Sequence, residues 1–166
     1  MHDSNRQMQL ASELRGWMKE ALREARHAMS HGDVPVGAVV VKDGRIIGKG
    51  HNSRELLRDA TAHAEMIAIT AACESIGNWR LDGCDIFVTL EPCPMCASAI
   101  QQARIKRIVF GAYERSMGAC ESLMNLPGDR RFGRPVEIIA PVLEEECTTL
   151  LAEFFLTVRS KDKGET

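Results

Sequence analysis

Apolar residues recur at helical spacing in the first part of the chain. Between residues 14 and 29 they follow a period of three or four, at Leu14, Trp17, Met18, Ala21, Leu22, Ala25 and Met29. This spacing predicts an amphipathic helix. His31 and Gly32 follow directly, and a glycine just after the last periodic residue is a common helix stop. We therefore expect a helix over this segment that packs one face against a core.

The pattern then changes to short apolar runs separated by turn residues. VPVGAVVV (34–41) and IIGKG (46–50) flank an Asp-Gly pair, which is a strong signal for a β-hairpin. Further strands are expected at residues 84–90, 107–112 and 136–143. Helical spacing returns at residues 64–77, 96–103 and 144–159.

Helices and strands thus alternate along the chain, with no internal repeat or low-complexity tract. Such alternation is typical of α/β proteins, in which helices cover both faces of a sheet. We expect a three-layer α/β/α sandwich with a mixed five-stranded sheet. The length of 166 residues and the hydrophobic content of 45% fit one domain. That domain is predicted to span residues 1–160, and the polar residues 161–166 are expected to fray.

Composition limits the cellular location and the kinds of partner that can be expected. No run approaches the ~20 apolar residues of a membrane span, and the first residues lack the apolar stretch of a signal peptide. The expected location is therefore the cytoplasm, where disulfides are rare, so the six cysteines are expected to be free thiols or metal ligands. The formal charge of -2 does not suggest a general coat for nucleic acid. A polyanionic partner would have to be bound by a small local group of residues and not by a broad basic surface.

The stretch LEPCPMC (90–96) places Cys93 and Cys96 where a predicted strand ends and a helix begins. Ligands usually bind at the carboxyl edge of strands in an open α/β sheet. The exposed amides of a helix N-terminus also favour the thiolate form, which is the form that binds metals. Pro94 suits the first helical turn, where its missing N–H costs nothing.

A lone C-x-x-C leaves three interpretations open, namely a redox pair, half of a structural zinc site, or part of a catalytic zinc site. A structural zinc site needs a second pair of ligands at comparable spacing. The remaining cysteines are instead scattered singly, at Cys73, Cys84, Cys120 and Cys147. A redox pair would leave the unusual stretch TAHAEM (61–66) without a role.

In TAHAEM, His63 and Glu65 stand at the start of a predicted helix. Taken alone, such a histidine is more often structural or exposed, and a first-turn glutamate often only complements the helix dipole. Two helices that open with metal-binding residues can, however, point their N-termini at one place. One histidine and two cysteines would then leave a fourth position open, which is the arrangement of a catalytic zinc site.

The motif H-x-E followed by P-C-x-x-C is the signature of zinc nucleobase deaminases, and this chain resembles that family by its HAE and PCPMC. Further stretches narrow the resemblance to the bacterial tRNA-specific adenosine deaminases. They are DVPVGAVVV, GHN, DATAHAEMIAI, VTLEPCPMCASAI, RIVFGA, GACESLMNL and the segment from EC to EFF. The similarity extends from about Trp17 to Phe155.

The resemblance implies a cytidine deaminase-like fold and one zinc ion per subunit, held by His63, Cys93 and Cys96. Glu65 is then the proton-transfer residue rather than a ligand. The implied reaction is deamination of adenosine to inosine at the wobble position of a tRNA anticodon, with an arginine tRNA as the expected substrate. The implied partners are the anticodon stem-loop and a second copy of the chain, with no DNA and no membrane.

The resemblance also implies substrate contacts. Asn52 is expected to contact the nucleoside, although asparagine after Gly and His is also an ordinary turn residue. Val34 and Pro35 are expected to line the base pocket. Glu91 either places its backbone carbonyl near the leaving amine or has a solvated side chain. Phe154 and Phe155 are expected to stack beside the anticodon bases, with at least one of them in the core.

One stretch departs from the family pattern, since Tyr113 and Glu114 replace a basic residue and an aspartate of familiar members. Contacts to the flanking nucleotides are therefore not carried over. Two alternative functions remain at this point. One is a small-molecule deaminase of the guanine or cytidine type with the same zinc site. The other is a non-catalytic, zinc-stabilised RNA-binding module.

Overall fold

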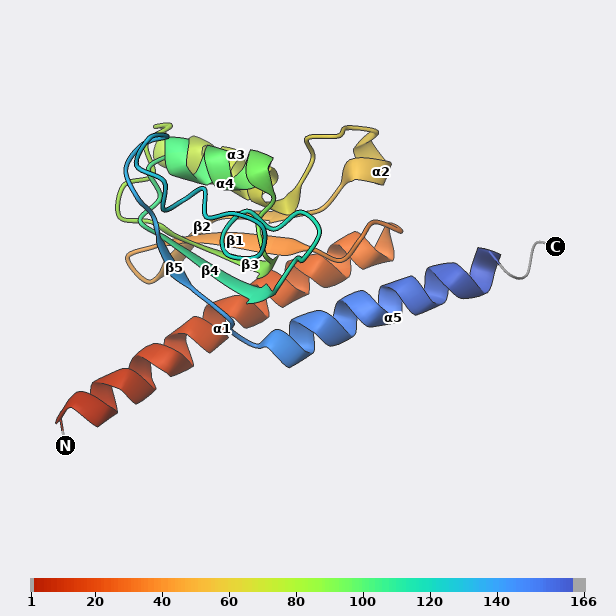
Figure 1. Ribbon diagram of the computed structural model, residues 1–166, viewed down its shortest axis with the longest axis horizontal. Coiled ribbons are helices and arrows are strands. Elements are labelled where there is room, and N and C mark those ends of the chain that lie inside the picture. Colours follow the sequence, from red (N-terminus) through yellow and green to blue (C-terminus); the bar gives the residue numbers. More distant parts are fainter. Residues whose placement is uncertain (1, 163–166) are drawn as a thin grey trace.

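A computed structural model describes residues 2–162 and shows one mixed sheet between two layers of helices (Figure 1). The elements are α1 (His2–Ser30), β1 (Gly37–Lys42), β2 (Arg45–His51), α2 (Arg54–Leu57), α3 (Ala64–Ile76), β3 (Asp85–Leu90), α4 (Pro94–Gln102), β4 (Arg107–Ala112), β5 (Glu137–Ile139) and α5 (Glu144–Asp162). The strand order is β2-β1-β3-β4-β5. The three-layer sandwich with a mixed five-stranded sheet is confirmed.

The sheet changes from antiparallel to parallel at β3. β1 pairs antiparallel with β2 and with β3, whereas β4 runs parallel to β3 and β5 parallel to β4. The β3–β4 crossover therefore needs α4, because parallel neighbours cannot be joined by a tight turn. As a result, β3 delivers the chain to the carboxyl edge of the parallel half, directly in front of α4.

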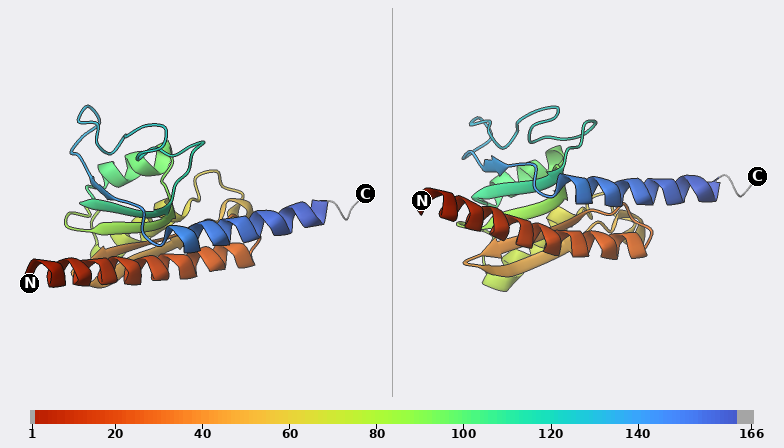
Figure 2. Two further views of the ribbon diagram at one scale, coloured as in Figure 1. Left: turned by 60° about the horizontal axis from the view of Figure 1, so that its bottom comes forward. Right: turned by 90° about the horizontal axis from the view of Figure 1, so that it is seen from below.

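The two faces of the sheet carry separate cores. Along β1, Ala38 and Val40 pack toward α3 and α4, whereas Val39 and Val41 pack toward α1 and α5. Figure 2 shows α1 and α5 together on one side of the sheet. Since both faces are covered, the central strands are apolar throughout rather than alternating, as is usual for such sheets.

Helix α3 lies directly on the backbone of β2. A Cβ atom on Gly48 or Gly50 would overlap the backbone of α3, with the amide nitrogens of Ala72 and Ala68 each only 2.6 Å away. The two glycines therefore set the height of α3 above the sheet. Because the metal-binding candidate His63 stands at the start of α3, this packing also fixes its position.

Four details differ from the sequence-based expectation. Helix α1 already begins at His2, and the four-residue α2 was not predicted. The last strand covers only 137–139 instead of 136–143, because Pro141 has no N–H to donate to the ladder. Of the predicted frayed end, residues 161 and 162 belong to α5, and residues 163–166 lie outside the described part of the chain.

All six cysteines are free, as expected for a chain without disulfides. Within residues 2–162, no helix has the length and apolar character to cross a membrane.

Candidate metal centre and active site

Two helix N-termini meet beside the carboxyl end of β3. His63 is the N-cap residue of α3 and Cys93 is the N-cap residue of α4, and neither side chain caps its own helix. Pro94 occupies the first turn of α4, as the sequence predicted. Both side chains are therefore available to a common ligand in front of the two helices.

The side chains of His63, Cys93 and Cys96 converge. The Sγ atoms of Cys93 and Cys96 lie 3.6 and 3.5 Å from Nδ1 of His63, and the three ligand atoms lie within 4.8 Å of one another. Tetrahedral zinc with Zn–S of ~2.3 Å and Zn–N of ~2.0–2.1 Å separates such atoms by about 3.5 Å. The donor set and its spacing therefore fit one zinc ion with a fourth position left open.

The electrostatics of the two thiols favour metal binding. Hydrogen bonds from the Cys96 and His63 side chains lower the pKa of Cys93 to about 4, so this sulfur is a thiolate at neutral pH. The hydrogen bond to Cys93 and burial together raise the pKa of Cys96. The pair thus shares one proton, which a bound cation would displace.

Glu65 lies in the first turn of α3 with only 4% of its surface exposed. Burial raises the pKa of its carboxyl group to about 7. A carboxyl group with a pKa near the working pH can both accept and donate a proton, which is the requirement for general acid–base catalysis. The structure thus places Glu65 beside the metal ligands.

A pocket of about 270 Å³ opens in front of these residues. It is lined by Val34, Val36, Asn52, Arg54, His63, Ala64, Glu65, Leu90, Glu91, Cys93, Glu114 and Met117. Its size is close to the lower end of small-ligand pockets, which are typically ~300–1,000 Å³. The pocket therefore suits a single flat group such as a nucleobase.

Of the residues expected to contact substrate, Val34, Asn52 and Glu91 line the pocket. Asn52 also holds the pocket wall, because its side-chain amide donates to the Val34 carbonyl oxygen at 3.1 Å and its backbone N–H donates to Val36 at 2.9 Å. Pro35 is buried between two lining residues and is not itself part of the lining. Val36, which sequence reasoning missed, takes that place.

Phe154 and Phe155 lie apart from the pocket lining, on α5. Their rings meet edge to face at 5.4 Å, Phe154 is half-buried, and 46% of Phe155 is exposed. Neither is therefore a core residue, contrary to the expectation for at least one of them. Their predicted stacking on anticodon bases stays a prediction.

Glu91 has a buried side chain, so the alternative of a solvated side chain is wrong. Its Oε1 accepts backbone N–H groups of residues 120–122 at 3.2, 2.7 and 2.8 Å. Its Oε2 accepts the backbone N–H of Glu114 at 3.0 Å and the hydroxyl of Ser122. Burial alone would raise the pKa of Glu91, but these hydrogen bonds outweigh it and hold the pKa below its usual value.

The role of Glu91 follows from these bonds. Its carboxylate folds the loop 114–122, which brings Glu114 and Met117 to the pocket. Sequence reasoning missed this role together with the lining residues Arg54 and Met117. The available signal was an acidic residue directly after a buried strand. The sequence does not indicate, however, which backbone N–H groups donate hydrogen bonds to its carboxylate.

Comparisons with known proteins agree with this site. The family model of the cytidine and deoxycytidylate deaminase zinc-binding region matches residues 11–112. The tRNA-specific adenosine deaminase of Bacillus subtilis is 48% identical over 148 residues, covering 89% of this chain and 92% of that protein. The tRNA-specific adenosine deaminase of Aquifex aeolicus is 44% identical over 144 residues, covering 87% and 95%.

The chain belongs to the tRNA-specific adenosine deaminases. A solved structure from a study of A-to-I editing by tRNA:A34 deaminases superposes on this deaminase with a TM-score of 0.79 and 42% identity, covering 81% of this chain and 98% of that chain. Membership makes this deaminase a zinc enzyme of the same superfamily as cytidine deaminase. The ligand set, the buried carboxyl group and the pocket described above are its candidate active site.

Proposed function

We propose that this chain converts adenosine to inosine by hydrolysis at the wobble position of a tRNA anticodon, with an arginine tRNA as substrate. The observation that carries the proposal is the buried carboxyl group of Glu65 in the same pocket as His63 and Cys93. Relatives that cover nearly the whole chain, and are named for this activity, support the choice of substrate.

The reaction replaces the amino group at C6 of adenine by oxygen and releases ammonia. His63, Cys93 and Cys96 would hold the zinc ion, which would lower the pKa of a bound water from ~15.7 to ~7 and so supply a nucleophile at neutral pH. Glu65 takes a proton from the attacking water, gives it to the ring nitrogen as C6 becomes tetrahedral, and then helps to protonate the departing amine. Its raised pKa suits a group that must accept and return protons.

The pocket walls position the base. Val34, Val36 and Leu90 offer apolar surface to a planar ring, while Asn52 and the backbone supply the polar groups of the lining. A few polar groups in an otherwise apolar pocket fix ligand orientation. Burial of Glu65 and the walls around it also keep bulk water away from the proton transfer.

The test is incubation of the zinc-loaded protein with an arginine tRNA anticodon stem-loop that carries adenosine at the wobble position. Mass analysis of the RNA should show inosine in place of that single adenosine, with ammonia released in equal amount. Free guanine, cytidine and adenosine should not react. Deamination of a free base with no reaction of the stem-loop would favour the small-molecule deaminase. Bound zinc without any ammonia release would favour the non-catalytic RNA-binding module.

The homodimer and the cytoplasmic location stay predictions. A homodimer would be measured by the mass of the zinc-loaded protein in solution. The expected mass is twice that of the 18.4 kDa chain. A monomer that deaminates the stem-loop at full rate would contradict the dimer but not the chemistry.

A further inference from the structure

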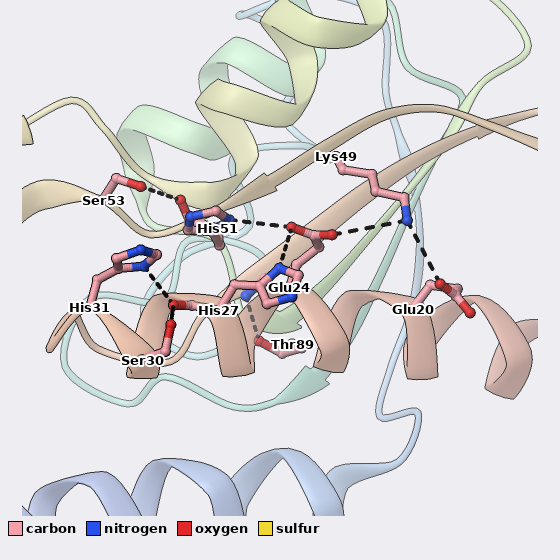
Figure 3. A network of polar contacts seen from close by, with 10 residues as sticks. Glu20, Glu24, His27, Ser30, His31, Lys49, His51, Ser53 and Thr89 are labelled. Carbon is pink, nitrogen blue, oxygen red and sulfur yellow. Dashed lines mark hydrogen bonds and ion pairs between the residues drawn. The ribbon is translucent and has the colours of Figure 1, made fainter. Parts of the chain in front are cut away.

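Three of the five histidines of the chain lie together (Figure 3), in a group separate from His63, Cys93 and Cys96. His27 is in the last turn of α1, His31 directly follows this helix, and His51 ends β2. Their rings are neighbours, because the ring of His51 lies 5.8 Å from that of His27 and 5.9 Å from that of His31. The carboxylate of Glu24 faces this group from α1. Nothing in the deaminase chemistry uses these side chains.

The contacts converge on one oxygen of Glu24. Its Oε2 lies 3.3 Å from Nδ1 of His51 and 3.6 Å from Nδ1 of His27. The three ligand atoms lie within 4.8 Å of one another. Tetrahedral zinc with bonds of ~2.0–2.1 Å separates nitrogen and oxygen ligands by about 3.4 Å, so small rotations of the two rings bring all three atoms into range.

Glu24 is held in place by the packing of α1 on the sheet. Only 8% of its surface is exposed, and a Cβ on Gly37 of β1 would come within 2.8 Å of the Glu24 Cβ. Buried carboxylates are normally paired with cations or coordinate metals. Here the nearest lysine, Lys49, reaches only 4.0 Å from the other carboxylate oxygen. The fixed carboxylate and the two imidazoles thus form a preorganised donor set.

We propose that Glu24, His27 and His51 bind a second divalent transition-metal ion, with zinc as the best candidate. Two imidazole nitrogens and one carboxylate oxygen are a common donor set for zinc, and water would complete the coordination. Hard cations such as magnesium are not suited to imidazole. Within residues 2–162, this group and the His63–Cys93–Cys96 set are the two clusters with metal-binding geometry.

Binding at this second site is weaker than at the thiolate site. The metal must displace the hydrogen bond between His51 and Glu24, and the ammonium group of Lys49, 4.0 Å from the other Glu24 oxygen, repels it. His27 also has an exposed side chain, with 62% of its surface accessible. The second ion therefore exchanges with free metal, whereas the first is retained during dialysis.

The second ion would connect two segments that frame the active-site pocket. It joins the end of α1, which leads to Val34 and Val36, to the end of β2, which leads to Asn52. The backbone carbonyl of His51 also accepts the hydroxyl of Ser53 at 3.0 Å. A metal bridge between α1 and β2 would thus restrict the movement of this pocket wall and raise the thermal stability of the folded chain.

The test is equilibrium dialysis of the zinc-loaded protein against micromolar free zinc, followed by metal analysis. The wild-type chain should hold two zinc ions per chain in the presence of free zinc and one after dialysis against metal-free buffer. His27→Ala and His51→Ala should each bind the second ion at least ~10-fold more weakly. His31→Ala is the matched control, because His31 stacks on His51 but donates no ligand, and it should keep the second ion.

Two further readouts separate a metal site from adventitious binding. Free zinc should raise the melting temperature of the wild type and of His31→Ala but not of the His27→Ala/His51→Ala double variant, and magnesium should change none of them. Lys49→Gln should tighten binding several-fold, because it removes a positive charge next to Glu24. A wild type that holds one zinc ion throughout, or a double variant that still binds two, would overturn the proposal.

Discussion

The carboxyl group of Glu65 is almost fully buried beside the three candidate metal ligands, although burying a neutral side chain there would cost less free energy. We predict that Glu65→Gln removes the proton transfers but leaves the zinc ligands in place. General acid–base groups typically contribute ~10²–10⁴-fold, and one residue that serves several transfers should lie at or beyond the upper end. Inosine formation should therefore fall by about 10⁴-fold or more, while zinc content and RNA affinity are retained.

A matched control lies on the same helix. Glu74→Gln changes an exposed glutamate of α3 and should leave all three quantities unchanged. Loss of zinc together with activity in Glu65→Gln would show that Glu65 supports the metal site instead of moving protons. Inosine formation near the wild-type rate would show that it does neither.

The half-buried carboxyl group of Asp85 gives a pH-dependent effect. Burial raises its pKa above 3.8 despite the opposing Arg107, whose guanidinium lies 3.6 Å away, and its Oδ1 has no hydrogen-bond partner. The folded chain therefore binds this proton more tightly than the unfolded chain, so Asp85 favours folding below pH 3.8 and loses that contribution as pH rises through its folded pKa.

Urea unfolding of wild type and Asp85→Asn over this pH range isolates the effect. The stability of the wild type minus that of the variant should decrease as pH rises, since the variant carries no titrating group at this position. A difference that grows with pH would mean that the Arg107 ion pair outweighs burial.

The residues of the site were predictable to the extent that chemistry dictates their type. Zinc requires nitrogen and sulfur donors, so His63, Cys93 and Cys96 stand out in the sequence even though 30 residues separate the histidine from the first cysteine. Pocket walls carry no such signature, because many apolar residues serve equally well. Met117 and Val36 were therefore missed, and Pro35 was expected in the place of Val36.

At the scale of elements, the contact between α3 and β2 depends on the absence of a side chain. Gly50→Ala would drive a methyl group into the backbone of α3 and should destabilise the protein by about 3 kcal/mol, the upper end for overpacking. Gly16→Ala is the control, since Gly16 lies exposed within α1 with nothing near its Cβ position. That change should stabilise the protein by ~0.5–1 kcal/mol.

Urea denaturation midpoints of the two variants measure both effects. If Gly50→Ala lowered the urea midpoint only as little as Gly16→Ala raised it, the close packing of α3 on β2 would be contradicted. Zinc content should also fall in Gly50→Ala, because displaced α3 carries His63 away from the two cysteines. Gly16→Ala should retain its zinc.

Elements were predictable where packing imposes a period. The apolar stripe of α1 starts near Leu14 because only the following part of the helix lies on the sheet, so the exposed turns before it gave no signal. Helix α2 has four residues and none of them is buried, and it therefore shows no pattern either. The last strand was predicted too long because apolar residues continue as far as Leu143, whereas the regular pairing with β4 ends at Ile139.

At the scale of the whole molecule, the narrow pocket limits which RNA can react. A base must leave its stack to reach Glu65, and extraction from a duplex costs a few kcal/mol more than from a loop. If the proposed function is right, a fully paired RNA of the same sequence should react at least ~100-fold more slowly than the anticodon stem-loop. Single-turnover rates on the two RNAs provide the measurement, and equal rates would contradict this limit.

The loop 114–122 is held by the carboxylate of Glu91 and by the hydrogen bond from the Ala119 N–H to the Pro92 carbonyl oxygen, whereas the candidate metal ligands and Glu65 lie at the N-termini of the helices α3 and α4. This part of the pocket lining is thus built separately from the candidate reactive groups. Insertions or replacements in the loop can reshape the pocket mouth while the reactive groups keep their positions. Libraries confined to the exposed residues 115–117 should accordingly yield folded, zinc-loaded proteins with altered substrate preference, and a new specificity would require no new catalytic machinery.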